Sequence, residues 1–353
     1  MSKVNLKDLT PDELVAFVRE LGEPAFRARQ LLRWIYTARE TDFERMTNLS
    51  LKLRSRLQEK AEIPELALKQ ERHSEQETTK YLFTLPDGEV IESVRMHYLG
   101  DDVGPGRVAV CISTQVGCAM ACDFCASGKL GLRRNLATWE IVDQVLQIQK
   151  RLDEQGERVA NVVFMGIGEP LHNYRNTLRA VRMINSPEGL GIGMRHLTIS
   201  TAGLVPRIRE LAAEKLPLRL AISLHATNDE LREKIMPINR KWKLASLLEA
   251  CRDYQEATSR RVTFEYVLLD GINDSVEEAH ELVRLLSGTH SLVNLIPWNP
   301  IEGVPYKRSR PARVRAFQEV VEKSGIKCTV RQEKGSDIAA ACGQLRLSDL
   351  KPA

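Results

Sequence analysis

The sequence predicts an α/β fold in which parallel strands alternate with helices, preceded by a small helical module and a strand hairpin. Three observations lead to this prediction. Up to about residue 63, apolar residues recur at helical spacing, and from about residue 80 to residue 113 the period becomes that of strands. From residue 159 onward, short strand-like segments alternate with longer helix-like ones. Such alternation forms a parallel sheet with crossover helices.

The first helix is predicted from its start signals. Thr10 can cap it, Pro11 suits its first position, and Glu13 can reach back as in a capping box. Its apolar stripe is formed by Leu14, Phe17, Val18 and Leu21, and Gly22 ends it.

A second helix is expected to begin near residue 23. We expect it to bury Phe26, Leu31, Trp34 and Ile35 and to expose Arg27, Arg29, Arg33 and Arg39. These arginines either face solvent only or contact RNA. Together the helices indicate an N-terminal helical accessory domain over residues 1–75, which would be RNA-binding if these arginines contact RNA.

Residues 76–110 are predicted to form a strand and hairpin extension. Segments 81–85 and 90–96 flank Pro86-Asp87-Gly88, whose residues favour a tight turn. A further strand over 108–112 leads into a group of cysteines.

Residues 111–353 are expected to form the core domain. Its predicted strands span 159–165, 196–201, 218–224, 262–268, 293–296 and 327–331. Its predicted helices span 139–152, 174–184, 205–213, 244–257, 276–286 and 314–323. In barrels and open sheets alike, ligands bind at the carboxyl ends of such strands.

Composition limits the class of protein. The chain has 353 residues and a formal net charge of only +4, so nucleic-acid binding would require clustered basic residues. Seven cysteines without an even framework indicate a reducing compartment. No signal peptide and no apolar run of membrane-spanning length is present, so we expect a cytoplasmic protein without a membrane partner.

Cys118, Cys122 and Cys125 are crowded into eight residues and are candidate metal ligands. Structural zinc needs four ligands, usually from two Cys-x2-4-Cys groups, and only one group is present. A cubane iron–sulfur cluster takes one thiolate per iron, so three local cysteines would leave one iron open for substrate. A zinc knuckle completed by a distant residue is the alternative.

Small or polar residues follow several predicted strands and are candidate ligand contacts. Gly166-Ile167-Gly168-Glu169-Pro170 would allow a ligand near the backbone, although a simple tight turn explains it as well. The other strand-end candidates are Ser200, Ser223, Leu224, His225 and Asn299, which could equally be caps or turn residues. His225 has no metal-spaced partner, so we interpret it as a hydrogen-bonding group.

Cys342 lies among small residues and precedes Gly343, which indicates an exposed loop. Cys251 and Cys328 lie among apolar residues and are expected to be buried filler.

The Cys-x3-Cys-x2-Cys spacing, with Phe124 before the last cysteine, resembles the signature of the radical S-adenosylmethionine (SAM) superfamily. A larger set of motifs resembles the RlmN-type adenine-C2 RNA methyltransferases over nearly the whole chain. These motifs are Cys111-Ile112-Ser113-Thr114-Gln115-Val116-Gly117-Cys118, Arg134-Asn135-Leu136, Gly168-Glu169-Pro170, Ser223-Leu224-His225, Met236-Pro237-Ile238-Asn239, Pro297-Trp298-Asn299-Pro300 and Ala341-Cys342-Gly343-Gln344-Leu345.

This resemblance implies a partial (β/α)6 radical SAM barrel that binds one 4Fe-4S cluster and consumes two SAM molecules per turnover. The cluster ligands would be Cys118, Cys122 and Cys125. The implied SAM contacts are Gly168, Glu169, Ser200, Ser223, Leu224, His225 and Asn299, with Glu169 in the loop that holds the SAM amino group.

The resemblance also implies a covalent mechanism. Carbon 2 of adenine is electron-poor and cannot attack a methyl sulfonium, so a radical must attack the carbon instead. In the family, one SAM methylates a cysteine that matches Cys342, and a 5′-deoxyadenosyl radical from a second SAM takes hydrogen from that methyl group. Cys111 matches the thiol that then forms a transient disulfide with Cys342. Glu92 matches the proton acceptor, although an exposed strand carboxylate is the alternative.

The implied substrates are an adenine at the peptidyl-transferase centre of 23S rRNA and the adenine 3′ of the anticodon in tRNA. An external low-potential electron donor such as flavodoxin and a monomeric state are expected. Basic residues for phosphate contacts would be Arg133, Arg134, Lys307, Arg308, Arg310, Arg313 and Arg315. Alternatives are a Cfr-type adenine-C8 methyltransferase, a radical SAM enzyme for a peptide or small molecule, and a non-catalytic zinc-containing RNA-binding protein.

Overall fold

The structure is a computed structural model that describes residues 3–75, 77–99 and 106–345. The last eight residues of the predicted core domain therefore lie outside the described residues. None of the helices in these ranges is long and apolar enough to cross a membrane.

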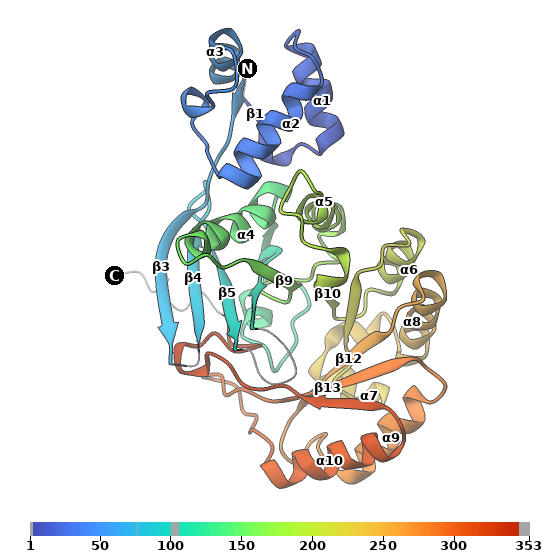
Figure 1. The fold of residues 1–353 in the computed structure, drawn as a ribbon. Helices are drawn as coiled ribbons and strands as arrows, with labels where there is room; N and C mark the ends of the chain where they lie inside the picture. Colours follow the sequence, from blue (N-terminus) through green and yellow to red (C-terminus); the bar gives the residue numbers. More distant parts are fainter. Residues whose placement is uncertain (1–2, 76, 100–105, 346–353) are drawn as a thin grey trace.

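A ten-stranded sheet forms the centre of the molecule (Figure 1). Its strands, in spatial order, are β14 (Lys327–Val330), β13 (Ser291–Pro297), β12 (Val262–Leu268), β11 (Arg219–Ser223), β10 (Leu197–Thr201), β9 (Val159–Phe164), β6 (Arg107–Cys111), β5 (Val90–Tyr98), β4 (Thr78–Thr84) and β3 (Ala67–Ser74). In this sheet β6 and β9 to β14 pair in parallel, and β3 to β6 pair in antiparallel.

Helices cross between successive parallel strands and cover the outer face of the sheet (Figure 1). They are α4 (Thr138–Asp153), α5 (Tyr174–Asn185), α6 (Val205–Ala213), α7 (Asp229–Ile235), α8 (Leu244–Thr258), α9 (Val276–Leu286) and α10 (Pro311–Lys323). The prediction of an α/β fold on a partial (β/α)6 barrel is confirmed, with β14 as an additional parallel strand. Helix α7 was not predicted, because a seven-residue segment is too short to show a clear period.

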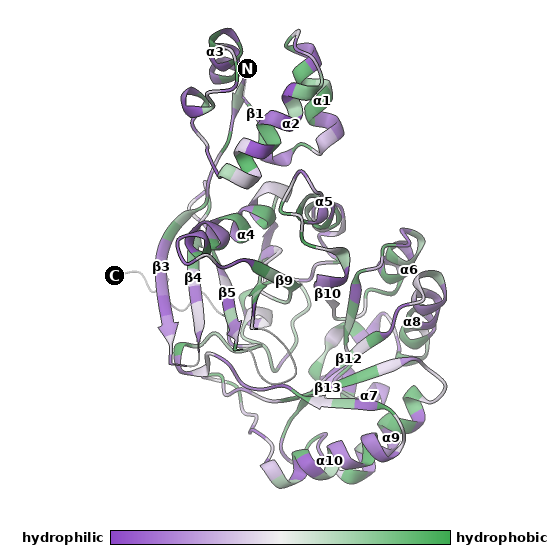
Figure 2. Ribbon diagram, viewed as in Figure 1, coloured by the Kyte–Doolittle hydropathy of each residue, from purple (hydrophilic) through white to green (hydrophobic). Residues whose placement is uncertain are grey.

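The antiparallel extension contains one more strand than predicted. β3 lies within residues 1–75, where only helices were expected, and it pairs with β4. Most of its residues are hydrophilic, as its colouring in Figure 2 shows. None of them is fully buried. Its sequence therefore lacks the alternation that predicts a strand.

After β14, the chain runs across the open side of the barrel toward β3 (Figure 1). Lys334 Nζ donates to the carbonyl of His97 on β5 at 2.9 Å, and Ser74 Oγ on β3 donates to Asp337 at 2.6 Å. This C-terminal segment, residues 331–345, thus bridges the two edges of the sheet.

The N-terminal module contains α1 (Pro11–Glu20), α2 (Phe26–Leu32), a π-helical continuation (Arg33–Ala38) and α3 (Leu51–Lys60), with β1 (Val4–Asn5) paired to β2 (Ala61–Glu62). The capping box of Thr10 and Glu13 is confirmed. The burial of Phe26 was predicted wrongly, because its side chain is 52% exposed and lies under the Arg27 guanidinium.

A buried ion pair docks this module onto the core. Lys7 Nζ contacts Asp143 Oδ1 on α4 at 2.6 Å, and both side chains are almost fully buried. The other oxygen of Asp143 accepts from the backbone N–H of Leu66 at 2.7 Å. The ion pair fixes the module beside α4 and α5.

Candidate active site

The predicted cluster cysteines lie in one loop between two short strands. β7 (Gln115–Gly117) and β8 (Leu132–Asn135) form an antiparallel pair, so the two ends of the loop lie side by side. Gly117 has φ +75°, and a Cβ there would lie 1.8 Å from the carbonyl oxygen of Gly131. Only glycine permits this close crossing at the start of the loop.

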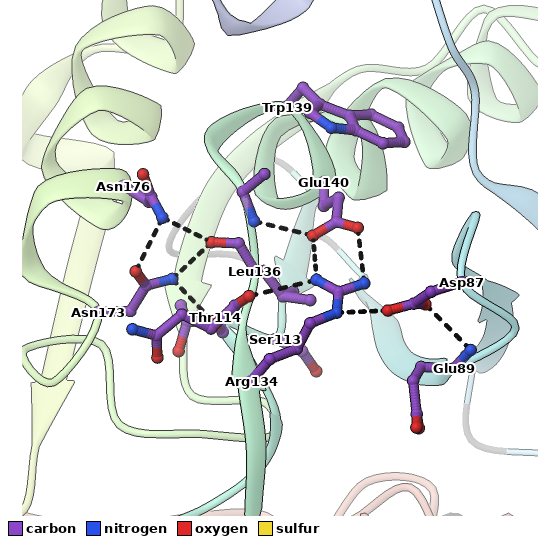
Figure 3. A network of polar contacts seen from close by, with 12 residues as sticks. Asp87, Glu89, Ser113, Thr114, Arg134, Leu136, Trp139, Glu140, Asn173 and Asn176 are labelled. Carbon is purple, nitrogen blue, oxygen red and sulfur yellow. Dashed lines mark hydrogen bonds and ion pairs between the residues drawn. The ribbon is translucent and has the colours of Figure 1, made fainter.

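Figure 3 shows how this hairpin is held against the helices. The Arg134 guanidinium donates two hydrogen bonds to Glu140 on α4, at 2.7 and 2.9 Å, and a third to Asp87 at 2.6 Å. Asn173 donates to the carbonyls of Thr114, which precedes β7, and of Leu136, which follows β8. Arg134 was predicted as a phosphate contact, but its donors are used to position the hairpin.

Side chains from distant strands fix the cysteine loop itself. Trp298 Nε1 donates to the Phe124 carbonyl at 3.0 Å, and the Tyr306 hydroxyl donates to Asp123 at 2.7 Å. The backbone N–H of Ala126 donates to the carbonyl of Gly343 in the C-terminal segment at 2.9 Å. The loop is therefore fixed relative to Cys342.

Cys118, Cys122 and Cys125 line one cavity inside the carboxyl end of the barrel, which we call the cluster cavity. Its empty volume is about 860 Å³, including its open mouth. Burial raises the pKa of Cys118 to about 12, so both this thiol and the similarly buried Cys122 need a metal to become thiolates. Among the described residues, no three Cys, His, Asp or Glu side chains converge as ligands of a single metal ion. One zinc ion requires such convergence, whereas a cluster takes its thiolates on separate irons.

The Gly166–Pro170 loop follows β9 and lines the same cavity. A Cβ on Gly166 would lie 2.6 Å from the Ile112 backbone, and one on Gly168 would lie 2.6 Å from the Gln115 side chain. The glycines are thus required by the packing of this loop against the segment before the cysteines. Both glycines also line the cluster cavity, and their predicted role of making room for a ligand there stays a prediction.

Glu169 is buried and its carboxylate accepts from the backbone N–H groups of Leu171 at 3.0 Å and Ala202 at 2.7 Å. Burial raises its pKa to about 7, although both hydrogen bonds oppose this shift. A cation that binds beside Glu169 would favour the ionised form.

Three more predicted SAM contacts line the cluster cavity, namely Ser200, Ser223 and His225. His225 has φ +61°, and its Nδ1 accepts from the Val267 N–H at 3.0 Å, so its Nε2 carries the proton. Burial lowers its pKa to about 3, which keeps the ring neutral. These contacts agree with our interpretation of His225 as a hydrogen-bonding group.

Leu224 does not line the cavity. Its side chain is fully buried, and its carbonyl accepts from Arg232 at 3.0 Å. The same guanidinium, which is fully buried, donates to the carbonyls of Ala202 and Ser223. Sequence reasoning missed Arg232, which ties together the ends of β10 and β11.

A second cavity adjoins the first and is lined by both Cys111 and Cys342; we call it the thiol cavity. Cys342 lines both cavities and is exposed, whereas Cys111 is buried. Burial raises the pKa of Cys111 to about 12, and the loss of bulk solvent inside the barrel also raises the pKa of Cys342. Asn299 lines this second cavity, and its amide donates to the carbonyl of Cys342 at 3.1 Å.

Glu92 is buried on β5, so the exposed carboxylate considered as an alternative is wrong. It is two residues from Val94, which pairs with Cys111 and contacts the same apolar cluster, so Glu92 faces the barrel interior. Lys80 Nζ lies 3.2 Å from Glu92 Oε1 and also donates to the Ala339 carbonyl. Lys80 was also missed, because a lysine within a strand carries no distinctive sequence signal.

The chain is similar to known protein families and to individual known proteins. The Ribosomal RNA large subunit methyltransferase N-terminal domain family matches residues 4–63, and the Radical SAM superfamily matches residues 112–285. The chain is 50% identical to a "Probable dual-specificity RNA methyltransferase RlmN" of Symbiobacterium thermophilum, over 97% of this chain and 91% of the relative. The chain belongs to the RlmN family of radical SAM methyltransferases.

Further similarity supports this membership. An RlmN relative of Desulforamulus reducens is 50% identical over 98% of this chain and 96% of its own. A crystal structure of "a radical SAM methyltransferase from Sphaerobacter thermophilus" superimposes with a TM-score of 0.92 at 45% identity, over 97% of this chain and 99% of that one. The RlmN resemblance predicted from the sequence is thereby confirmed.

Two arginines of the basic segment near residue 310 are already engaged in ion pairs. Arg308 pairs with Glu333 at 2.6 Å, and Arg313 pairs with Asp274 at 2.7 Å. Within the described residues, Lys307, Arg310 and Arg315 are exposed and have no ion pair. They are the members of the segment that remain available for phosphate.

Proposed function

We propose that this chain methylates carbon 2 of adenine, both in the peptidyl-transferase centre of 23S rRNA and 3′ of the anticodon in tRNA. The observation that carries the proposal is that two free thiols, Cys111 and Cys342, line one cavity beside the three cluster cysteines. A radical SAM enzyme whose reaction uses no cysteine other than its three cluster ligands would not need Cys111 and Cys342 beside the cluster. Names of the RlmN relatives, which include dual-specificity RNA methyltransferase, support the RNA substrates.

The residues fit the cofactors that the radical SAM family implies. Three thiols on one loop can each bind one iron of a 4Fe-4S cluster, and no fourth local cysteine occupies the open iron. Glu169, Ser200, Ser223 and His225 surround the same space with groups that can hold SAM. Asn299, the remaining proposed contact, lines the adjoining thiol cavity. When bound, the cluster and two SAM molecules per turnover supply the methyl group and the one-electron chemistry that activates it.

Cys342 would carry the methyl group as a thioether. The C-terminal segment holds it between the two cavities, through the Asn299 amide and the Ala126 N–H. After the methylene carbon on Cys342 has added to adenine, loss of one electron, which the bound cluster would take up, and of the proton on carbon 2 restores the aromatic ring. Glu92 would accept that proton from its position on the interior face of β5.

Cys111 would release the product. Its thiolate attacks the sulfur of Cys342, the S–S bond forms, and the bond from that sulfur to the methylene carbon breaks. The electron pair stays on the carbon, which takes up a proton and becomes the methyl group. Because burial raises the pKa of Cys111, a base must remove its proton as the attack occurs.

Phosphate contacts would come from the exposed Lys307, Arg310 and Arg315, and from Arg29 and Arg33 on the N-terminal module. The adenine must be unstacked to enter the cavity, as in RNA loops. We also propose an external low-potential electron donor such as flavodoxin and a monomeric enzyme.

Nucleoside analysis of rRNA and tRNA from cells that lack the gene tests the proposal. We expect 2-methyladenosine to disappear from both RNAs and to return when the gene is restored. A change in 8-methyladenosine instead would indicate a Cfr-type enzyme. Unchanged modification of both RNAs would contradict the proposal.

A further inference from the structure

Arg331 lies where the cluster cavity and the thiol cavity meet. It follows β14 directly, and its backbone N–H donates to the Leu295 carbonyl at 2.8 Å, which fixes where its side chain enters the barrel. Its side chain lines both cavities, as does Cys342, and Cys111 lines the second one. A guanidinium is therefore placed beside both proposed reactive thiols.

The guanidinium has no oxygen partner among residues 3–75, 77–99 and 106–345. Its one side-chain hydrogen bond there runs from Nη1 to the Met165 sulfur at 4.0 Å, and a thioether is a weak acceptor. Glu265 lies in the same interior, but its Oε2 accepts from Asn294 at 2.8 Å and it forms no ion pair with Arg331 among these residues. Arg308, which also lines the thiol cavity, is by contrast paired with Glu333.

This guanidinium stays charged. Burial lowers the pKa of Arg331, but the charges of Cys342 and Glu265 outweigh burial and raise it overall. Arg331 is partly buried and lines both cavities, so its unused N–H donors face the space that a ligand would occupy. The free donors therefore indicate a ligand that presents an unprotonated acceptor near Cys342.

We propose that Arg331 donates a hydrogen bond to a ring nitrogen beside carbon 2 of the target adenine, and so holds that carbon against Cys342. This inference rests on the proposed function. Carbon 2 lies between N1 and N3, which are both unprotonated acceptors. As the carbon approaches Cys342, both nitrogens enter the cavities that Arg331 also lines.

The hydrogen bond also assists the chemistry. When a carbon radical adds to carbon 2, a C–C bond forms and the unpaired electron spreads over the neighbouring ring nitrogens. A cationic donor at one of these nitrogens stabilises that state more than the starting ring, so Arg331 lowers the barrier as well as binding the base.

The first test replaces Arg331 by Met (Arg331→Met) in the cluster-loaded enzyme, with Lys327→Met as the control. Lys327 is an exposed cation on the same strand. We expect both variants to keep wild-type iron content, SAM affinity and methylation of Cys342, measured by mass spectrometry. The single-turnover rate on substrate RNA should fall about 10- to 100-fold in Arg331→Met alone, as expected for loss of a charged hydrogen bond.

The second test removes the acceptor from the RNA. Substrates with 1-deazaadenosine or 3-deazaadenosine at the target position replace one ring nitrogen by C–H. We expect one of these substrates to slow the wild-type enzyme, and the same substrate to cause no additional loss in Arg331→Met.

The inference would be overturned if, with both deaza substrates, the loss of rate from the substrate multiplied independently with the loss from Arg331→Met. It would also be overturned if Arg331→Met failed to bind SAM or to methylate Cys342. An unslowed Arg331→Met enzyme would overturn it as well. Failure of the proposed function is distinguishable, because the wild-type enzyme would then form no 2-methyladenosine in natural RNA.

Discussion

At the scale of single residues, the site consists of buried groups whose charge depends on a ligand. Burial raises the pKa of Cys118, Cys122 and Glu169 and lowers that of His225. Each shift favours the neutral form of the free protein. Binding of metal or of a cation restores the charged form of the first three groups, so the site is electrostatically prepared for its cofactors.

The raised pKa of Glu169 predicts a pH-dependent affinity for SAM. Because its pKa is about 7, the carboxyl is largely ionised at pH 8 and largely protonated at pH 6. If it binds the SAM amino group as a carboxylate, the affinity for SAM should fall about tenfold as the pH is lowered from 8 to 6. Equilibrium binding of SAM to the cluster-loaded protein measures this. Glu169→Gln should bind weakly and independently of pH, and a native enzyme with the same affinity at both pH values would contradict the assignment.

Removal of the resolving thiol should trap a covalent complex. In Cys111→Ala, nothing attacks the Cys342 sulfur, so enzyme and RNA should remain joined and migrate together in a denaturing gel. Cys251→Ala is the control, since Cys251 is also a buried thiol but lines neither cavity. A Cys111→Ala enzyme that releases methylated RNA at the native rate would remove Cys111 from the mechanism.

At the scale of elements, the cluster loop depends on the β7–β8 hairpin and its attachment to α4. Arg134 joins β8 to Glu140 and to the Asp87 turn (Figure 3). Bidentate pairing of this kind fixes both distance and orientation. The position of the three cysteines is thus set by residues that bind neither iron nor SAM.

Arg134→Met should therefore loosen the loop. Glu140 is largely buried and would lose its cationic partner, so we expect a loss of about 1–3 kcal/mol in the free energy of unfolding. The reconstituted variant should also lose iron to a chelator faster than the native protein. Arg133→Met is the matched control, because the Arg133–Glu89 pair is mostly exposed and should contribute little. Equal effects of the two substitutions would argue against a specific role for Arg134.

At the scale of the whole molecule, two terminal segments complete the barrel. The N-terminal module docks on α4 through Lys7 and Asp143, and the C-terminal segment crosses from β14 to β3 and carries Cys342. The barrel supplies the cluster loop, and the segment brings the methyl carrier to it.

Lys7→Met should destabilise the docked module, because Asp143 would remain buried without its counter-charge. Breaking such a pair costs about 3–5 kcal/mol, and urea unfolding would measure the loss. The double variant Lys7→Met/Asp143→Met should recover part of the lost free energy of unfolding. Lys3→Met is the control and should have no effect, since Lys3 is exposed. Unchanged unfolding of Lys7→Met would show that the module is held by its apolar contacts alone.

Much of the fold could be predicted because its signals are local. The capping box at Thr10, the hairpin turn at residues 86–88 and the apolar strands of the parallel sheet depend on nearby residues. β3 and α7 were missed because a hydrophilic edge strand and a short helix have no clear period. Phe26 was misplaced because helical spacing does not say which face will be covered.

The sequence by itself determined the family and the five cysteines proposed to act in the reaction, because their motifs are short and specific. Only the tertiary structure decided which side chains surround them. Arg331 follows β14, Lys80 lies on β4 and Arg232 on α7, and no spacing along the chain relates these residues. Strand register and the crossing of the C-terminal segment place Lys80 beside Glu92, Arg232 across the ends of β10 and β11, and Arg331 beside both thiols.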